Sequence, residues 1–465
     1  TTVVGMPVDY PDALELAQRI PSDFTMGVAT SSWQIEGASS SRGRSIWDEF
    51  SETPGRVRDG ATSDPACDHL AHISEDVNLL ARLGVDAYRF SFSWPRLIPE
   101  GTGSVSATGL GVYDRLVDEM SERGITPYAT LYHWDLPQVL QEKGGWLHPD
   151  SHKWFADYCY LVGEHFGDRI DTMATLNEPW VSAFLGYASG VHAPGVKNPA
   201  ASLEVFYRLM VASGHGIQAL KSTSVGKPGI VLNLTTIIAE DEDVAPAAQV
   251  MDGLQNRMFL DLLAGRPLPA DVLEATQAIT DWSFVTGEGL ALAAEPITWL
   301  GVNYYTPTRV GSRGVDAGKT VGQESSVYPG ISGVSFVPKT PHTAMGWEIH
   351  AESLTTTLVT TAERLPGVPL YVTENGAAFD DVVSEEGIHD NKRIAYYRDH
   401  ISAALDAKDQ GVDLRGYFAW SLFDNLEWAE GWTKRFGIVR VDADTQLRTL
   451  KDSAHFLREV FTSRS

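Results

Sequence analysis

Short apolar runs rich in β-branched and aromatic residues recur along the chain, and each one ends where polar or aromatic side chains resume. Continuous apolar runs of this length are typical of strands buried on both faces of a parallel sheet. Several follow segments with helical character, such as Ser74–Leu83 and Leu110–Arg123, which stop at Gly84 and Gly124, glycines suited to a left-handed cap. The pattern predicts eight strands, at Phe24–Thr30, Ala87–Phe92, Thr126–Tyr132, Asp171–Asn177, Gly229–Leu234, Thr298–Tyr304, Pro369–Thr373 and Gly416–Ser421.

Strand and helix alternate, which favours a parallel sheet covered by helices on the outside. Eight such strands predict an α/β fold, a single (β/α)8 TIM barrel with long βα-loop insertions that account for the length of the chain. We expect one domain over residues 1–465, because no Ser- or Pro-rich linker divides the chain. An open doubly wound sheet is the alternative, but no Gly-x-Gly-x-x-Gly follows the first strand and no Gly-x-x-x-x-Gly-Lys-[Ser/Thr] occurs.

Composition narrows the class of protein. Of 465 residues, 43% are hydrophobic, so the chain can bury a large core and is neither disordered nor fibrous. Its 36 Lys and Arg against 61 Asp and Glu give a formal charge of −25, which repels phosphate backbones and anionic lipids. We therefore expect no nucleic-acid partner and no membrane partner, and no apolar run of about 18 residues is present to span a bilayer.

Cysteine usage and the N-terminal segment bear on the compartment. Cys67 and Cys159 are expected to be two unpaired core thiols and not a disulfide. Residues Thr1–Tyr10 lack the basic and apolar regions of a signal peptide, so we expect a cytoplasmic protein. The sequon Asn233–Thr235 falls in an apolar run, which predicts part of a buried strand and not a glycan site.

Polar side chains cluster where the predicted strands end, and two of them are glutamates that each neighbour an asparagine. Glu178 and Glu374 come directly after apolar runs, where burial shifts the pKa of a carboxyl group. Two facing carboxylates can cleave a glycosidic bond, because one protonates the leaving oxygen while the other meets the anomeric carbon. Chemistry is therefore expected at one mouth of the barrel, where the strand ends carry Gln34, Arg89, His133, Trp134, Asn177, Glu178, Asn303, Tyr305, Glu374, Asn375 and Trp420.

The two glutamate motifs, Thr175-Leu-Asn-Glu-Pro179 and Val372-Thr-Glu-Asn-Gly376, resemble the signature pair of family-one glycoside hydrolases, the β-glucosidase family. The resemblance extends from about Phe24 to Lys451, nearly the whole chain. It is supported by the stretches at 24–37, 87–95, 131–137, 301–305, 345–348 and 420–428, which occur in the order of the family.

The resemblance implies a role for each matching residue. Glu178 would be the general acid/base and Glu374 the nucleophile, with Arg89 and Tyr305 beside the nucleophile. The implied reaction is retaining hydrolysis of terminal non-reducing β-D-glucosyl residues from cello-oligosaccharides and aryl or alkyl β-glucosides, through a covalent glycosyl-enzyme, with side activity on β-galactosides and β-fucosides. The substrate-binding residues would be Gln34, His133, Trp134, Asn177, Asn303, Trp347, Trp420, Glu427, Trp428 and Phe436.

The resemblance implies no cofactor and no metal, and the partner is a small-molecule β-glucoside or oligosaccharide. The oligomeric state stays open, and a homo-oligomer is compatible with the sequence. On the outer side of the site, the family places residues corresponding to Trp180, Leu185, His192 and Trp347.

Four alternative functions fit the sequence less well. A 6-phospho-β-glycosidase has Ser, Lys and Tyr where this chain has Glu427, Lys434 and Phe436; Lys434 fits, but Glu427 would repel the phosphate. A thioglucosidase has Gln at the position of the acid Glu178. A metal-dependent barrel hydrolase could use His69 and His72, but no His-x-His ends the first strand. A non-catalytic sugar-binding barrel usually lacks one of the two glutamates.

Overall fold

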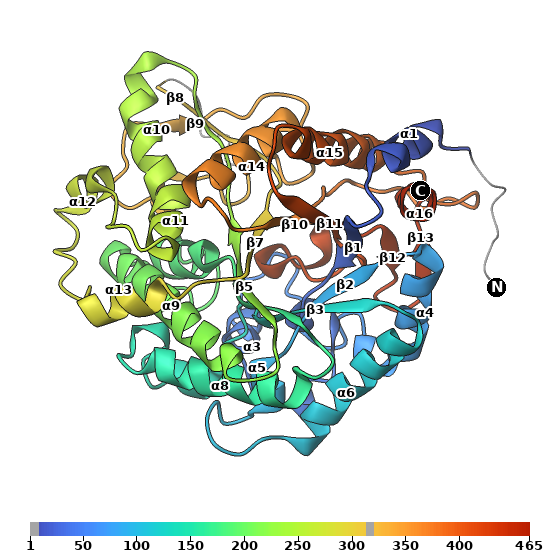
Figure 1. Cartoon of the computed structure of the whole chain (residues 1–465), viewed down its shortest axis with the longest axis horizontal. Helices are drawn as coiled ribbons and strands as arrows, with labels where there is room; N and C mark the ends of the chain where they lie inside the picture. The colour runs from blue at the N-terminus through green and yellow to red at the C-terminus, as the bar shows by residue number, and fades with distance from the viewer. Residues whose placement is uncertain (1–8, 313–319) are drawn as a thin grey trace.

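Eight parallel strands close into a barrel in the computed structural model, which describes residues 9–312 and 320–465 (Figure 1). The strands follow the order β1-β11-β10-β7-β5-β4-β3-β2 around the barrel. All eight predicted strands are confirmed, with ends shifted by a few residues, and the fold is a (β/α)8 barrel. Their bounds are β1 Thr25–Ala29, β2 Ala87–Ser91, β3 Thr126–Tyr132, β4 Thr172–Asn177, β5 Lys227–Asn233, β7 Trp299–Asn303, β10 Leu370–Asn375 and β11 Leu414–Trp420.

Helices surround the barrel, and α4, α6, α8, α9, α14 and α15 form an outer ring in Figure 1. The predicted left-handed glycines are confirmed: Gly84 caps α4 with φ 74°, and Gly124 follows α6 with φ 68°. The helices are α1 Pro11–Arg19, α2 Ser32–Ile35, α3 Ile46–Glu52, α4 Ile73–Leu83, α5 Trp94–Leu97, α6 Ala107–Glu122, α7 Gln138–Gln141, α8 Ser151–Phe166, α9 Pro199–Lys221, α10 Ala245–Asp252, α11 Met258–Leu263, α12 Ala270–Thr276, α13 Gly287–Ala293, α14 Glu352–Arg364, α15 Asn391–Asp409 and α16 Asp452–Thr462.

The βα loops carry small elements of their own, as expected for long insertions. A three-stranded sheet combines β6 Ile237–Ala239, β8 Thr308–Gly311 and β9 Ser335–Phe336 from the loops after β5 and β7. A two-stranded sheet, β12 Val439–Val441 with β13 Arg448–Leu450, follows β11. The π-helix η4 Val181–Ser189 follows β4. The sequence analysis did not anticipate these elements.

Aromatic side chains fill the barrel interior because small residues on neighbouring strands make room for them. A Cβ at Gly229 would lie 2.6 Å from the ring of Trp299, and one at Gly27 would lie 2.7 Å from the ring of Phe418. This packed interior is continuous with the side chains at the mouth of the barrel; the cluster comprises Ala29, Ala87, Tyr128, Ala174, Val231, Trp299, Met345, Tyr371, Ala378, Phe418, Trp420 and Phe436.

Other expectations can be compared with the structure. Cys67 and Cys159 are both buried, unpaired thiols, as predicted. The expectation that the sequon lies in a buried strand is met only in part, because Asn233 is the last residue of β5 and half-buried, and Thr235 lies beyond the strand. Within the described ranges no helix has the length and apolar character needed to cross a bilayer. Thr1–Tyr10, where we expected no signal peptide, lies almost entirely outside the described residues.

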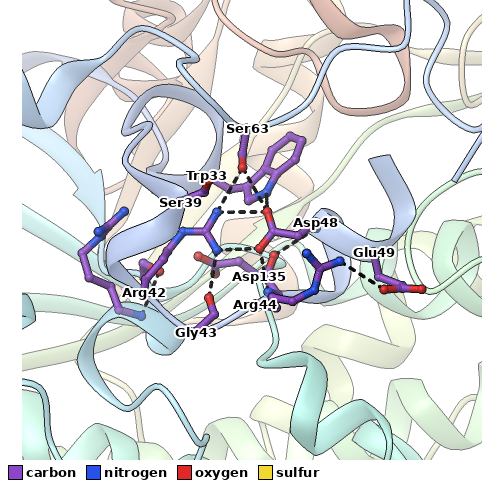
Figure 2. A network of polar contacts seen from close by, with 12 residues as sticks. Trp33, Ser39, Arg42, Gly43, Arg44, Asp48, Glu49, Ser63 and Asp135 are labelled. Carbon is purple, nitrogen blue, oxygen red and sulfur yellow. Dashed lines mark hydrogen bonds and ion pairs between the residues drawn. The ribbon is translucent and has the colours of Figure 1, made fainter. Parts of the chain in front are cut away.

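The loop after β1 contains a buried ion pair behind the barrel mouth (Figure 2). Asp48 on α3 accepts hydrogen bonds from Arg42 Nη1 at 2.5 Å and Nη2 at 3.0 Å, and their side chains are 6% and 4% exposed. The same carboxylate accepts from Trp33 Nε1 and Ser63 Oγ, both at 3.0 Å. A capping box with Ser45 also fixes Asp48 at the start of α3. These contacts hold the indole of Trp33 in one orientation.

A second buried network ties the C-terminal region to two loops at the mouth. Lys451, which is fully buried before α16, lies 2.6 Å from Asp381 in the loop after β10 and 2.7 Å from Asp424 in the loop after β11. Arg393 on α15 also pairs with Asp381, at 2.9 Å, and donates to the carbonyl of Arg435 at 2.7 Å. The loops after β10 and β11 are therefore held against each other from behind.

We predict that Asp48→Ala lowers the free energy of unfolding by about 3–5 kcal/mol, because it leaves the Arg42 guanidinium buried without its partner. Urea denaturation at neutral pH measures the change. Glu52→Ala on the same helix is the control, since its pair with Arg44 is about half exposed on both sides and contributes about 1 kcal/mol or less. Equal effects of the two substitutions would contradict the prediction.

The same pair predicts a pH dependence. Burial alone would raise the pKa of Asp48, but the hydrogen bonds and charge of Arg42, with bonds from Ser45 and Trp33, lower it to about 2 from 3.8. A depressed carboxyl pKa stabilises the folded state above the unfolded value and loses that contribution as pH falls through the folded value. The stability difference between wild type and Asp48→Ala should therefore shrink from pH 4 towards pH 2, measured by urea denaturation across that range.

Candidate active site

Two glutamates occupy the carboxyl ends of two barrel strands. Glu374 is the penultimate residue of β10, and Glu178 follows β4 directly, with a backbone φ of 50°. The amide of Glu178 donates to the carbonyl of Val231 on the neighbouring β5, at 2.9 Å, which fixes this turn. Both glutamates are buried, at 7% exposure for Glu178 and 3% for Glu374. They meet at one mouth because all eight strands run in the same direction.

A continuous chain of buried hydrogen bonds joins the two carboxylates. Asn303, at the end of β7, donates through Nδ2 to Glu178 Oε2 at 2.7 Å and to Asn177 Oδ1 at 3.0 Å. Arg89 on β2 donates through Nη2 to the same Asn177 oxygen and through Nη1 to Glu374 Oε1, both at 2.8 Å. This series of hydrogen bonds therefore fixes both carboxylates relative to one another through side chains on four strands.

The two carboxylates have different surroundings. Both oxygens of Glu374 accept hydrogen bonds, one from Arg89 and one from the Tyr305 hydroxyl at 2.5 Å. Glu178 accepts one hydrogen bond, from Asn303. Burial and then the charge of Glu374 raise the pKa of Glu178 well above its usual range, against the smaller opposing effects of Asn303 and Arg89. Glu178 is therefore suited to hold a proton next to an anionic Glu374.

Two neighbouring groups keep their uncharged forms. Burial and then the charge of Glu374 raise the pKa of Tyr305 well above its usual value, so Tyr305 remains a hydrogen-bond donor. Burial and then the charge of Arg89 lower the pKa of His133, which keeps its imidazole neutral. Asn177 Nδ2 contacts His133 Nε2 at 3.1 Å, so this ring is joined to the same network.

Stacked aromatic rings form one wall of the mouth. The ring of His133 lies between Trp420, at 5.9 Å and 19° between planes, and Trp428, at 5.8 Å and 14°. Trp33 stacks on Trp428 at 5.5 Å, so the buried Asp48 network reaches this wall (Figure 2 shows Trp33 within the network). Trp134 packs 4.4 Å from Trp428. The rings of the wall are therefore packed against one another and against the Asp48 network.

The loop after β11 carries a further carboxylate to the site. Glu427 precedes Trp428, and Gln34 on α2 anchors this loop by donating to the carbonyl of Leu426 at 2.8 Å. Burial and then the charges of Glu374 and Glu430 raise the pKa of Glu427 to about 8. Glu427 also contributes to the raised pKa of Glu178. The three carboxylates of the mouth are thus electrostatically linked.

Aromatic side chains form the outer side of the mouth. The ring centroid of Trp347 lies 5.4 Å from that of Tyr305 and 6.0 Å from that of Phe436. The centroids of Phe436 and Tyr305 are 5.9 Å apart. Trp180 packs 5.6 Å from Tyr328. Since the Tyr305 hydroxyl also donates to Glu374, this aromatic cluster directly contacts one of the two strand-end carboxylates.

Hydrogen bonds, ring contacts or electrostatic effects connect each of the fourteen predicted site residues to this mouth. They are Gln34, Arg89, His133, Trp134, Asn177, Glu178, Asn303, Tyr305, Trp347, Glu374, Trp420, Glu427, Trp428 and Phe436.

The sequence analysis missed residues that support the mouth from behind. Thr373 donates to Asn303 Oδ1 at 2.6 Å and so orients the amide that faces Glu178. Trp33 and Asp48 lie behind Trp428. Each of the three had a signal in the sequence: Thr373 and Trp33 lie in the family-like stretches at 372–376 and 24–37, and Ser45-x-x-Asp48 has the spacing of a capping box.

The histidines of the metal alternative lie elsewhere. His69 Nδ1 lies 2.7 Å from the buried Asp76, and His72 Nδ1 lies 2.8 Å from the carbonyl of Asp68. In the described part of the chain no group of three His, Cys, Asp or Glu residues has the arrangement of a metal site. The reading of these two histidines as structural residues is consistent with their contacts.

Comparison with known proteins agrees with this geometry. The model for glycosyl hydrolase family 1 matches residues 16–465. β-Glucosidase A of Thermotoga maritima is 43% identical over 452 residues, which are 95% of this chain and 98% of that protein. A bifunctional β-D-glucosidase/β-D-fucosidase of Bifidobacterium breve is 42% identical, over 96% of this chain and 98% of its own length.

A solved structure extends the comparison to the fold. The Thermotoga maritima β-glucosidase in complex with deoxynojirimycin superposes with a TM-score of 0.88 at 42% identity, covering 96% of this chain and 99% of that one. Sequence, fold and the arrangement of two buried glutamates thus agree, and the chain belongs to glycosyl hydrolase family 1.

Proposed function

We propose that this protein is a retaining β-glucosidase that removes terminal non-reducing β-D-glucosyl residues from cello-oligosaccharides and aryl or alkyl β-glucosides. One observation carries the proposal: two buried carboxylates are joined by one hydrogen-bond chain but have opposite surroundings. Glu178 holds a proton and Glu374 accepts from a guanidinium and a phenol. This is the pair that acid-assisted displacement at an anomeric carbon requires.

In the first step, Glu374 attacks the anomeric carbon while Glu178 gives its proton to the leaving glycosidic oxygen. The carbon–oxygen bond to the aglycone breaks and an ester bond to Glu374 forms. Arg89 and Tyr305 hold the attacking carboxylate in place. Asn177, whose side-chain oxygen accepts from both Arg89 and Asn303, is positioned to meet the hydroxyl next to the reacting carbon, a contact that strengthens in the transition state.

In the second step, water replaces the aglycone. Once the ester has formed, the negative charge on Glu374 is gone, and with it one cause of the raised pKa of Glu178. Glu178, which gave its proton to the aglycone in the first step, therefore stays ionised more readily and removes a proton from the attacking water. The ester bond breaks, glucose leaves with its original anomeric configuration, and Glu178 is protonated again.

The surroundings of Glu427 favour an unphosphorylated sugar. Burial and the negative charge of Glu374 already raise the pKa of Glu427 to about 8, so a phosphate dianion bound beside Glu427 would add like charge to a buried acidic cluster. Lys434, which would bind the phosphate in a 6-phospho-β-glycosidase, instead donates to the carbonyl of Ala344 at 2.9 Å.

A carboxyl at Glu427 can bond an axial or an equatorial hydroxyl, and the fucosidase activity named for the Bifidobacterium relative supports side activity on β-fucosides and β-galactosides.

We further propose that residues 1–465 act as one catalytic domain. The N-terminal β1 pairs with β11, and α16 packs against α1, so both ends of the described chain belong to the same unit (Figure 1). The two buried, unpaired thiols fit the cytoplasmic location that we expect.

We predict that the wild type releases p-nitrophenol from its β-glucoside and that Glu374→Ala loses roughly 10⁴-fold or more of this activity, because no covalent nucleophile remains. Glu385→Ala, an exposed residue of the same βα loop, is the matched control and should keep wild-type rates. Proton NMR of the first product formed should show the β-anomer of glucose. A silent wild type, or an α-anomer as first product, would refute the proposed function.

A second prediction concerns the acid. Glu178→Gln should reduce kcat/KM for alkyl β-glucosides roughly tenfold or more beyond its effect on dinitrophenyl β-glucoside, whose leaving group needs no proton. In wild type, kcat/KM should fall as pH rises through the elevated pKa of Glu178, since the protonated form is active. Glu178→Gln should lack this alkaline limb. Equal losses for both leaving groups would exclude Glu178 as the acid.

A further inference from the structure

A short turn on the outer side of the mouth is attached to two neighbouring loops through the backbone of one residue, Ala344. The turn, residues 342–348, carries Trp347, and within it Ala344 uses both backbone groups. Its N–H donates to the carbonyl of Ala378 at 2.8 Å, in the loop after β10. Its carbonyl accepts from Lys434 Nζ at 2.9 Å, in the loop after β11. The turn is therefore attached to the loop that follows the nucleophile and to the loop that carries Glu427.

The far end of the turn has a separate anchor. Glu348 is 2% exposed and accepts from Arg309 at 2.9 Å through each of its oxygens. Trp347 Nε1 also donates to the carbonyl of Val321 at 2.8 Å. These contacts fix the end of the turn. They do not connect it to the loop after β11, which carries Glu427.

Lys434 provides that connection. It stands two residues before Phe436, on which Trp347 packs, and its side chain is half-buried. Among the residues that the structure describes, the bond from Lys434 to Ala344 is the one polar contact between the turn and the loop after β11. A hydrogen bond from an ammonium group to a carbonyl in a half-buried site is stronger than a neutral hydrogen bond, because the donor is charged.

We propose that Lys434 is a positioning residue for aglycone binding. By bonding Ala344, it sets the position of Trp347 relative to the loop after β11. This inference rests on the proposed function. Lys434 touches neither carboxylate in the structure, and its bond to Ala344 points it at the outer turn. The side chain therefore affects ligands that reach Trp347 and leaves binding of the glucosyl ring itself unchanged.

The test compares ligands with and without an aglycone. In Lys434→Met, which keeps the aliphatic stem, we expect the Kd for p-nitrophenyl 1-thio-β-glucoside to rise about three- to tenfold, as loss of one hydrogen bond implies. The Kd for deoxynojirimycin, which has no aglycone, should change by less than about twofold. Calorimetric titration measures both. Lys339→Met is the matched control, because its exposed ammonium pairs with Glu240 and not with Ala344.

Kinetics supply a second readout. For p-nitrophenyl β-glucoside, kcat/KM of Lys434→Met should fall by the same factor, roughly three- to tenfold. The rate of breakdown of the glycosyl-enzyme should be unchanged, because the aglycone has already left. In a Trp347→Ala background, the further change Lys434→Met should have an effect below about twofold, as expected for two residues that act through one contact.

Each result decides the proposal. Equal weakening of both ligands would show that Lys434 supports the glucosyl site or the whole fold, and unchanged binding of the thioglucoside would show that the bond to Ala344 has no role; either overturns it. Additive effects with Trp347→Ala would also overturn it. A wild type without turnover would refute the proposed function, while the titrations would still decide the role of Lys434.

Discussion

The guanidinium of Arg89 is the group on which the geometry of the mouth depends. It is 2% exposed and bonds Asn177 with one nitrogen and Glu374 with another, so it joins the ends of β4 and β10 across the barrel. A buried cation of this kind is stable only with its partners in place. The position of Glu374, the orientation of Asn177 and, through Asn303, the orientation of Glu178 therefore depend on one side chain on β2.

The positive charge of Arg89 also offsets part of the negative charge of the acidic groups at the mouth. Three carboxylates, Glu178, Glu374 and Glu427, share the mouth, and burial with mutual repulsion raises the pKa of two of them. Protons on Glu178 and Glu427 make both groups donors as well as acceptors. A neutral sugar with many hydroxyls suits such a site, because each hydroxyl can accept from one group and donate to another.

Much of this arrangement could be predicted from the sequence, and the exceptions have physical reasons. The eight barrel strands are buried on nearly every residue, as in β2 and β10, so they appear as apolar runs. The fourteen side chains at the mouth follow those runs or match family motifs. In contrast, β6, β8 and β9 have only two to four residues and leave no periodic signal. The bonds from Lys434 to Ala344 and from Lys451 to Asp381 join residues far apart in the chain, and residue type alone does not reveal a partner.

Closure of the barrel has a consequence for biosynthesis. β1 pairs with β11, so that Thr25 lies opposite Gly416, and the pair joins the first and last strands of the barrel. While the chain is being made, one edge of β1 has no neighbour until β11 has been synthesised, and an open strand edge is a template for pairing with other chains. The interval between synthesis of β1 and β11 is thus the period in which a nascent chain most needs protection from aggregation, and any fragment ending before β11 keeps that edge permanently.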